Sequence, residues 1–338
     1  MNTERRANIA DFRVSVDGVD FTDRARPRLV SLSITEKRGG EADQIDLMLD
    51  DSDRRLAIPK KGALIRVQLG WRQGSDVTPG LVDKGRFTAD EVSWSGPPDQ
   101  LAIRGRSADL TAAFRQRKEA AHKATTLGAL AQKVAAAHGL EARVAPELAG
   151  IEVAIIEQHG TSDMALLRRL GREHDAVATV KDRKLILSPI GSGKAPGGAA
   201  LPSLTLGPSD GDRYSYREID RSGEAGAEAR YHDVDTGERS TVKAGGGGSG
   251  TPRRVRKIHH SKAAAAAAAK AEAGRAARGA AEFDMQLALG RADLYPEQRV
   301  TLAGFKPEAD ARKWIIAEVS HRLDRAGGFT TSIKLETK

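Results

Sequence analysis

The chain has 338 residues, with 54 lysines and arginines, 46 aspartates and glutamates and no cysteine, so its formal net charge is +8. At about 150 residues per domain, this length predicts roughly two domains, or one large domain with a smaller companion. The lack of cysteine excludes a disulfide framework, a thiolate nucleophile and a cysteine-ligated metal site. No apolar run approaches the ~18 residues that span a bilayer and no secretory signal follows Arg5 and Arg6, so we expect no membrane insertion.

Residues 1–115 have the pattern of short strands. Apolar and polar residues alternate with the period of a half-buried strand over 12–16, 32–34, 45–49, 65–71 and 101–103. Asp17-Gly18 predicts a hairpin turn. A change of parity between Ala89 and Val92 predicts a β-bulge between them. Short strands separated by Gly, Pro and Asp turns predict a small antiparallel barrel or sandwich.

Residues 116–198 change to a helical period. Thr125 or Thr126 can cap a helix that ends at Gly139, and a second helix begins at Thr161-Ser162-Asp163. A strand at 151–155 lies between the helices, and a hairpin over 177–187 follows them. We therefore expect a compact α+β domain of about 70 residues, near the lower limit for an independent core.

Residues 199–338 return to strand patterning, with predicted strands at 204–206, 214–219, 283–289, 300–302, 313–323 and 329–335. A two-stranded ribbon is expected over 225–242, turning at 235–237. The glycine run 245–250 predicts a flexible connection, and Ser261 caps an alanine-rich helix over 263–277 that Gly279 ends. This insertion, about 245–280, is interpreted as an arm that orders on assembly, because a lone alanine helix gains little from burial.

The predicted fold is therefore α+β and mainly β. Two antiparallel barrel-like domains, 1–115 and 199–338, enclose a small α+β domain at 116–198. A duplicated barrel is a reasonable expectation from the common style of the two outer parts, although no repeat of individual residues is visible.

A search for catalytic and ligand-binding motifs gives weak matches. Gly207-Pro208-Ser209-Asp210-Gly211 matches the G-x-S-x-G string of hydrolases, but a strand pattern follows it where that motif needs a helix, so we interpret it as a turn. His259-His260 lies beside a basic run at 253–257 without a third ligand at a suitable spacing. We interpret that run as solvated charge or as an electrostatic contact with another subunit.

The remaining polar candidates have structural explanations. Glu173-His174-Asp175 closes a predicted helix, where a histidine is favoured by the helix dipole. His321 shares a strand face with apolar residues and is expected to pack in the core or at its rim. Residues 233–237 lack the downstream glutamate of a calcium loop, and no Walker loop, dinucleotide fingerprint or HExxH motif is present. We therefore expect no catalytic residue, no cofactor and no metal site.

Several segments together resemble a known family. They are the helix from Thr125 to Leu140, the run from Gln158 to Asp163, the segment 166–170, and the C-terminal stretches at Asp310, from Trp314 to His321 and at 327–331. This ordered set, spread from about residue 11 to 338, is similar to the phage late control protein D family. These are the baseplate hub proteins of contractile-tailed phages and of related tail-like injection particles. Glu297 departs from the family, which commonly has glycine after the proline of this turn.

The resemblance implies a structural protein of a virion or tail-like particle, made in the bacterial cytoplasm. It implies a homotrimer whose six barrel-like domains form a pseudo-sixfold ring between the sixfold tail tube and the threefold central spike. The implied partners are the tail spike protein, the tail tube protein, baseplate wedge proteins and the tape-measure protein. Gln158, Asp163, Trp314 and His321 are expected to be structural positions of the family motif.

Three alternatives remain open at this point. A type VI secretion spike has a hub part with similar barrels, although such chains usually continue into a β-helical needle and this sequence stops after the second barrel. A cell-wall hydrolase would need two carboxylates about 5–10 Å apart or a metal-bound water. A nucleic-acid-binding module would rest only on the net charge and the basic run, and sequence-specific binding is not expected.

Overall fold

The computed structural model describes residues 5–39, 41–107, 114, 116–123, 125–153, 156–195, 197–218, 226–233, 236–246 and 251–338. Some of the sequence predictions fall outside these residues. They are the end of the strand expected at 151–155, the last residue of the strand expected at 214–219, part of the turn at 235–237, and residues 247–250 of the glycine run.

The N-terminal strands form the first barrel, a name used here for β1 and β3–β7 with the short strand β2. Their bounds are β1 (Ile9–Val16), β2 (Val19–Asp20), β3 (Leu29–Lys37), β4 (Gln44–Asp50), β5 (Leu64–Gln73), β6 (Gly80–Ser95) and β7 (Gln100–Arg106). The short helices α1 (Thr22–Ala25) and η1 (Arg26–Arg28) connect β2 to β3. The side chains at alternate positions of these strands are buried together in one apolar core.

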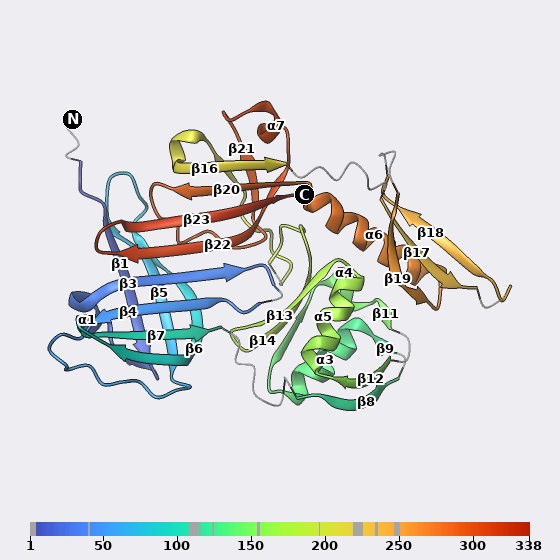
Figure 1. Cartoon of the computed structure of the whole chain (residues 1–338), viewed down its shortest axis with the longest axis horizontal. Coiled ribbons are helices and arrows are strands. Elements are labelled where there is room, and N and C mark those ends of the chain that lie inside the picture. Colours follow the sequence, from blue (N-terminus) through green and yellow to red (C-terminus); the bar gives the residue numbers. More distant parts are fainter. Residues whose placement is uncertain are drawn as a thin grey trace.

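The C-terminal strands form the second barrel, and Figure 1 shows them stacked above the first. Their bounds are β15 (Leu204–Leu206), β16 (Gly211–Glu218), β20 (Ala281–Leu287), β21 (Arg299–Leu302), β22 (Trp314–Asp324) and β23 (Gly328–Thr337). The helices η2 (Pro208–Asp210) and α7 (Pro307–Asp310) lie in its connections. A second apolar core, with Phe283, Trp314 and Ile316 among its members, fills this barrel.

The middle domain lies to one side of both barrels in Figure 1. Its elements are β8 (Lys118–His122), β9 (Thr125–Thr126), α3 (Leu127–Ala137), β10 (Glu141–Val144), α4 (Pro146–Ala149), β11 (Glu152–Val153), β12 (Ile156–Thr161), α5 (Asp163–Glu173), β13 (Ala176–Lys181) and β14 (Lys184–Pro189). Its own apolar core lies between the two longer helices and the sheet β10-β14-β13.

An arm extends from the second barrel beyond the middle domain (Figure 1). It consists of the sheet β18-β17-β19, formed by β17 (Ala227–His232), β18 (Arg239–Ala244) and β19 (Arg253–His259), and of helix α6 (Lys262–Arg278). Ala265, Ala268 and Ala269 of α6 are buried against this sheet. The interpretation of α6 as a lone helix with little to bury is therefore wrong, because small side chains let the helix pack closely on three strands.

The barrels share one sheet. In the described part of the chain, a 13-stranded sheet runs in the order β16-β20-β23-β22-β3-β4-β7-β6-β5-β1-β2, with β21 and β15 branching from β22. The first core also takes Leu323 and Phe329 from the second barrel and Ala292 from the loop after β20. The chain is mainly β with antiparallel barrels, as the sequence predicted.

The two barrels repeat one strand order. The first barrel runs β3-β4-β7-β6-β5-β1, and the second runs β16-β20-β23-β22-β21-β15. In each barrel two strands that are consecutive in the chain come first, β3-β4 or β16-β20. The last three strands of that barrel then follow in reverse chain order, β7-β6-β5 or β23-β22-β21. The sixth strands differ, since β1 runs antiparallel to β5 whereas β15 runs parallel to β21.

Local sequence signals explain most element ends. Asp17 and Gly18 have φ angles of 51° and 82°, as the two central residues of the predicted hairpin turn require. The side chains of Thr126, Ser162 and Ser261 accept hydrogen bonds from the first turns of α3, α5 and α6, so the three predicted N-caps are confirmed. The predicted bulge of β6 is confirmed between Ala89 and Glu91.

Strands β8, β10, β12 and β19 were not expected from the sequence. The basic run at 253–257, interpreted as solvated charge, lies in β19, which pairs in parallel with β17. Its charges are paired in part, because Arg254 contacts Glu228 at 2.6 Å and Lys257 contacts Glu173 at 2.7 Å. No helix in the described residues is long and apolar enough to cross a membrane.

Candidate functional site: the junction between the barrels

Strand β22 joins the two barrels because it changes its partner along its length. Its first residues pair with β21, with Val300 opposite Trp314. After a bulge between Ile316 and Glu318, its remaining residues pair with β3, from Glu318 opposite Lys37 to Asp324 opposite Ser31. The bulge increases the local twist of the strand and allows one strand to serve two barrels.

A buried charged cluster lies beneath this ladder. Lys84 Nζ from β6 lies 2.6 Å from Glu36 Oε2 of β3, and His321 Nε2 of β22 lies 3.3 Å from the same oxygen. The side chains of Lys84 and His321 are 0% exposed and that of Glu36 is 7% exposed. Burial lowers the pKa of Lys84 and of His321. Burial opposes ionisation of Glu36 as well, but His321 and Lys84 hold its pKa below the ordinary value.

The hydrogen bonds of His321 indicate which ring nitrogen has the proton. Thr331 Oγ1 accepts a hydrogen bond from the backbone N–H of Arg291 and lies 2.9 Å from His321 Nδ1. The hydroxyl hydrogen of Thr331 is then available to donate to Nδ1, which leaves Nε2–H directed at Glu36. This neutral form agrees with the lowered pKa of His321.

The loop between β20 and β21 completes the junction from the second barrel. Trp71 Nε1 of β5 donates to the carbonyl of Gly290 at 2.8 Å, and Lys84 Nζ donates to the carbonyl of Ala292 at 2.9 Å. Lys84 Nζ also lies 4.0 Å from the centre of the Tyr295 ring. Burial raises the pKa of Tyr295 to about 12. In place of water, the ammonium group of Lys84 therefore contacts one carboxylate, two backbone carbonyls and one aromatic ring.

Glu297 connects this loop to the other parts of the chain. It has a φ angle of 75°, a conformation that favours glycine, which accounts for the glycine expected here in the family. Its Oε1 lies 2.5 Å from Arg38 Nε, and its Oε2 accepts from the backbone N–H of Gly191, which follows β14 near the end of the middle domain. Arg38 also contacts Glu336 of β23 at 2.8 Å. Burial raises the pKa of Glu297.

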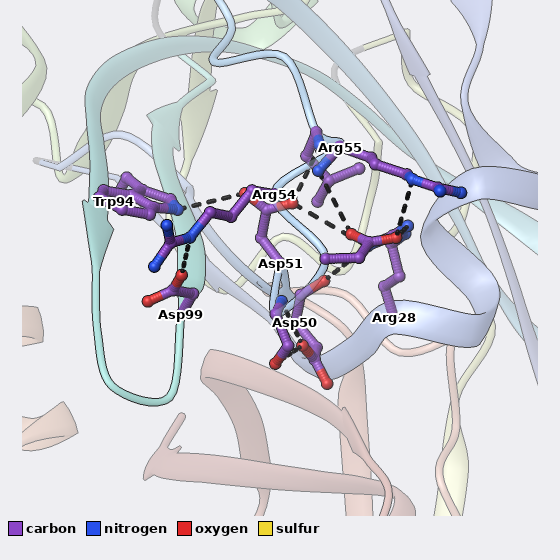
Figure 2. A network of polar contacts seen from close by, with 10 residues as sticks. Arg28, Asp50, Asp51, Arg54, Arg55, Trp94 and Asp99 are labelled. Atoms are coloured by element: carbon purple, nitrogen blue, oxygen red, sulfur yellow. Dashed lines mark hydrogen bonds and ion pairs between the residues drawn. The ribbon is translucent and has the colours of Figure 1, made fainter.

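The first barrel has a corresponding loop, between β4 and β5, which Figure 2 shows in detail. Asp51 accepts hydrogen bonds from the backbone of Leu56 and from Trp94 Nε1 at 3.2 Å. Arg54 Nε donates to Asp99 at 2.7 Å. Arg28 donates to Asp53 through Nη1 and Nη2 of its guanidinium group and lowers the pKa of Asp53 to about 2. The network orders a loop whose arginines remain at the surface.

Two of the four predicted motif positions meet in the middle domain. Gln158 Nε2 donates to Asp163 Oδ1 at 3.2 Å, and Asp163 Oδ2 lies 2.7 Å from His138 Nε2 and 2.8 Å from Lys118 Nζ. Burial opposes the charge on Asp163, but these partners hold its pKa below the ordinary value. Gln158 also donates to the carbonyl of Thr161, so the cluster connects β12 to the start of α5.

The other two positions lie on β22. Trp314 is buried in the second core and its Nε1 donates to the carbonyl of Ala309 at 2.8 Å. His321 is buried in the junction, as its expected packing in the core requires. Sequence inspection did not identify Glu36 and Lys84. In the sequence, each is a single charged residue beside an apolar strand pattern. Such residues are common on strands that face water.

The structure places two of the weak catalytic motifs in a turn and at a helix end. Ser209 lies in η2, which strand β16 follows, so the G-x-S-x-G string is a turn as predicted. His174 is the C-cap of α5, and burial lowers its pKa. Among the described residues, no group of three or more His, Asp and Glu side chains has a geometry that could hold a metal ion.

Comparison with known proteins identifies the class. Residues 44–327 match the family described as phage tail baseplate hub (GPD). The probable baseplate hub protein of Escherichia phage P2 is 35% identical over 97% of this chain and 93% of its own length. The chain therefore belongs to the phage tail baseplate hub family and is a component of a virion or tail-like particle.

Solved structures share the fold. The 43 kDa tail protein of prophage MuSo2 from Shewanella oneidensis aligns with a TM-score of 0.70 and 16% identity, over 96% of this chain and 98% of its own. The E. coli c3393 protein, a component of the type VI secretion system, aligns with a TM-score of 0.56 and 13% identity, over 96% of this chain and 76% of its own. At these identities the likeness concerns the fold alone.

We predict that Lys84→Met lowers the free energy of unfolding by about 3 kcal/mol, because it leaves Glu36 buried without its closest cation. Urea unfolding followed by circular dichroism measures the change. The double variant Lys84→Met/Glu36→Leu should recover part of the loss, since an apolar pair replaces the ion pair. Lys60→Met, at an exposed lysine of the first barrel, is the control. A Lys84→Met protein as stable as its parent would contradict the assigned pairing.

Acid should weaken the junction through His321. Its folded-state pKa lies below the unfolded value near 6.5, so the unfolded chain binds more protons and stability falls as pH drops below that value. His321→Gln should reduce the slope of unfolding free energy between pH 7 and pH 5 by at most about 1.4 kcal/mol per pH unit. Unfolding curves at several pH values test this, and an unchanged slope in the variant argues against it.

Glu297→Gly tests whether the side-chain contacts of Glu297 stabilise this turn by more than its positive φ angle costs. Glycine removes a positive-φ cost of about 1 kcal/mol. It also removes the contacts of Glu297 with Arg38 and the Gly191 N–H, which contribute more when buried. We expect the variant to be less stable by about 1–2 kcal/mol, as measured by thermal and urea unfolding. Increased stability would show that the turn needs only the backbone conformation.

Proposed function

We propose that three copies of this chain form a ring that joins the sixfold tail tube to the threefold central spike. The observation that supports this is the repeated strand order of the two barrels within one chain. Three such chains supply six similar barrels around a threefold axis, so the ring can present quasi-sixfold symmetry on one face and threefold symmetry on the other. The continuous sheet, together with the contacts of Glu36 with His321 and of Lys84 with the Ala292 carbonyl, would hold the two barrels of each chain at a fixed angle.

The proposed partners follow from this position. The tail spike protein and the tail tube protein would contact opposite faces of the ring. Baseplate wedge proteins would attach at its periphery, where the arm and the middle domain provide separate surfaces (Figure 1). The tape-measure protein would reach the ring from the tube side. We propose residues 1–115, 116–198 and 199–338 as the structural units, with Gln158, Asp163, Trp314 and His321 in structural roles.

We propose that the ring has no catalytic activity and uses no cofactor. The buried acidic residues of the junction face basic partners at short distances, so they are not a pair of carboxylates converging on an open cleft. Partly paired charges in β19 also weaken the argument for a nucleic-acid-binding surface. A cell-wall zymogram and salt-dependent retention on DNA test these two alternatives directly.

Co-expression with the tail spike protein of the same particle should give a stable complex of three hub and three spike subunits. The expected result is a single species of that mass in size-exclusion chromatography with light scattering and in native mass spectrometry. The hub purified alone is the control, because it trimerises more weakly if the spike contributes to the threefold contact. Monomeric hub in the presence of a folded, trimeric spike would reject the proposal. A covalent continuation of this chain into a needle would instead favour the type VI alternative.

A further inference from the structure

The bulged strands of the two barrels repeat at the level of single residues. In β6 the bulge is followed by Glu91-Val92-Ser93, and in β22 it is followed by Glu318-Val319-Ser320. Glu91 stands opposite Arg104 of β7, and Glu318 stands opposite Lys334 of β23. These ladders align Trp94 with His321 and Ser95 with Arg322.

A second pair of strands repeats in the same way. The β3–β4 ladder has a bulge between Leu29 and Ser31, and the β16–β20 ladder has one between Gly211 and Arg213. Beyond the bulges, Ser33 faces Asp46 in one barrel, and Ser215 faces Asp284 in the other. The ladders therefore align β3 with β16, residue by residue, and place Glu36 at the position of Glu218.

Each of the two repeated elements occurs twice in the chain, as β6 and β22 and as β3 and β16. The junction within the chain uses only β22 and β3. The residues of β22 after its bulge pair with β3. Their counterparts, β6 after its bulge and β16, are not joined to each other: β16 is the last strand of the described sheet. On the side away from β7, residues 91–95 have no ladder partner among the described residues. Each chain therefore has one edge of each kind left over.

We propose that residues 92–95 of β6 pair antiparallel with β16 of a second copy of this chain, in the register of the internal β22–β3 ladder. Transferring that ladder places four pairs opposite each other, the second residue belonging to the next copy: Val92 with Glu218, Ser93 with Arg217, Trp94 with Tyr216, and Ser95 with Ser215. This inference rests on the proposed trimer and names the contact that closes it.

The exposure of Trp94 supports this pairing. His321, its counterpart, is completely buried, whereas Trp94 is 45% exposed although it ends an inward-facing row of its barrel. Glu218, the counterpart of Glu36, forms an ion pair with Arg312, which lies just before β22, and these side chains are 52% and 30% exposed. Trp94 of the next copy would cover this pair as His321 covers the internal one. Tyr214, at the same edge, is 55% exposed.

The loop between β4 and β5, shown in Figure 2, corresponds to the loop between β20 and β21 that completes the junction within the chain. The backbone N–H of Asp51 donates to the carbonyl of Asp99, and that of Gly290 donates to the carbonyl of Phe329, at the aligned starts of β7 and β23. The loop after β20 packs on the start of β6, so the loop after β4 would pack on the start of β22.

The resulting interface is heterologous, since an edge of the first barrel contacts a different edge of the second barrel. Such an interface forms a closed ring when the rotation from one barrel to the next is a whole fraction of a full turn. In a ring of three chains, every β6 edge is then paired with a β16 edge. The pairing also covers two exposed strand edges, which otherwise invite non-specific association.

Cysteine cross-linking tests the register, because the natural chain has no cysteine. In the double variant Ser95→Cys/Ser215→Cys, the two residues would be directly opposite across the subunit boundary, within the Cα range of about 4.4–6.8 Å that a disulfide requires. Mild oxidation of the assembled hub–spike complex should give disulfide-linked hub dimers and trimers on non-reducing gels. Each single variant should give none.

The matched control is Ser95→Cys/Ser209→Cys, which pairs the same residue of β6 with another exposed serine six positions earlier. At about 3.3 Å per residue it lies too far along the chain to form the bond. If light scattering shows trimers while the Ser95/Ser215 pair gives no cross-link, the proposed register is wrong and the proposed function stands. If no trimer forms with the spike, both are rejected. Equal cross-linking of both pairs also rejects the register.

Trp94→Ala gives an independent measurement. Because tryptophan in the centre of an interface often dominates its affinity, the variant should weaken trimerisation by at least about tenfold, measured by dilution in light scattering. Ile258→Ala, at an apolar residue of the arm that is 38% exposed, should leave trimerisation unchanged. Circular dichroism checks that both variants fold. An unchanged trimer in Trp94→Ala overturns the assignment of this edge.

Discussion

The structure depends on a strand that belongs to two barrels at once. β22 pairs with β21 before its bulge and with β3 after it, so neither barrel can rotate against the other without breaking a ladder of backbone hydrogen bonds. The charged cluster below the ladder strengthens this constraint. Glu36 and Lys84 both belong to the first barrel, and separation of the barrels would remove their contacts with His321 and with the Ala292 carbonyl of the second barrel.

This arrangement suits a component whose function is geometrical. The proposed match between two symmetries needs a fixed angle between the repeated units more than it needs high stability. Buried ion pairs contribute little net stability but are sensitive to position, since their partners must lie within hydrogen-bond distance. Glu297 extends the same constraint to the end of the middle domain through Gly191 and to the β3–β4 turn through Arg38.

The sequence predicted the elements better than their connections. Alternation and turn residues located the strands of both barrels, and Thr126, Ser162 and Ser261 marked helix starts because capping is a local effect. The pairing of β22 with β3 joins residues almost 300 positions apart, and no local pattern specifies it. The arm was misjudged for a similar reason: the alanines of α6 have a partner sheet whose third strand, β19, is highly charged in sequence.

The candidate site shows the same division. His321 and Trp314 were selected from the sequence because rare residue types stand out on a strand, and both are buried where strands meet. Glu36 and Lys84 were not selected, because single charged residues on strands usually face water. The equivalence of β6 and β22 depends on a three-residue identity that is too short to notice before the ladders align it.

The place where the arm leaves the second barrel has a consequence for the diversity of such proteins. The arm replaces what is a short hairpin turn in the first barrel, between β3 and β4, and it enters and leaves at neighbouring positions, since Glu218 pairs with Ala281. A segment attached at two adjacent points can be lengthened, exchanged or deleted without altering the strands that support it. Changes in this appendage can therefore accumulate while the sheet that joins the two barrels stays unchanged.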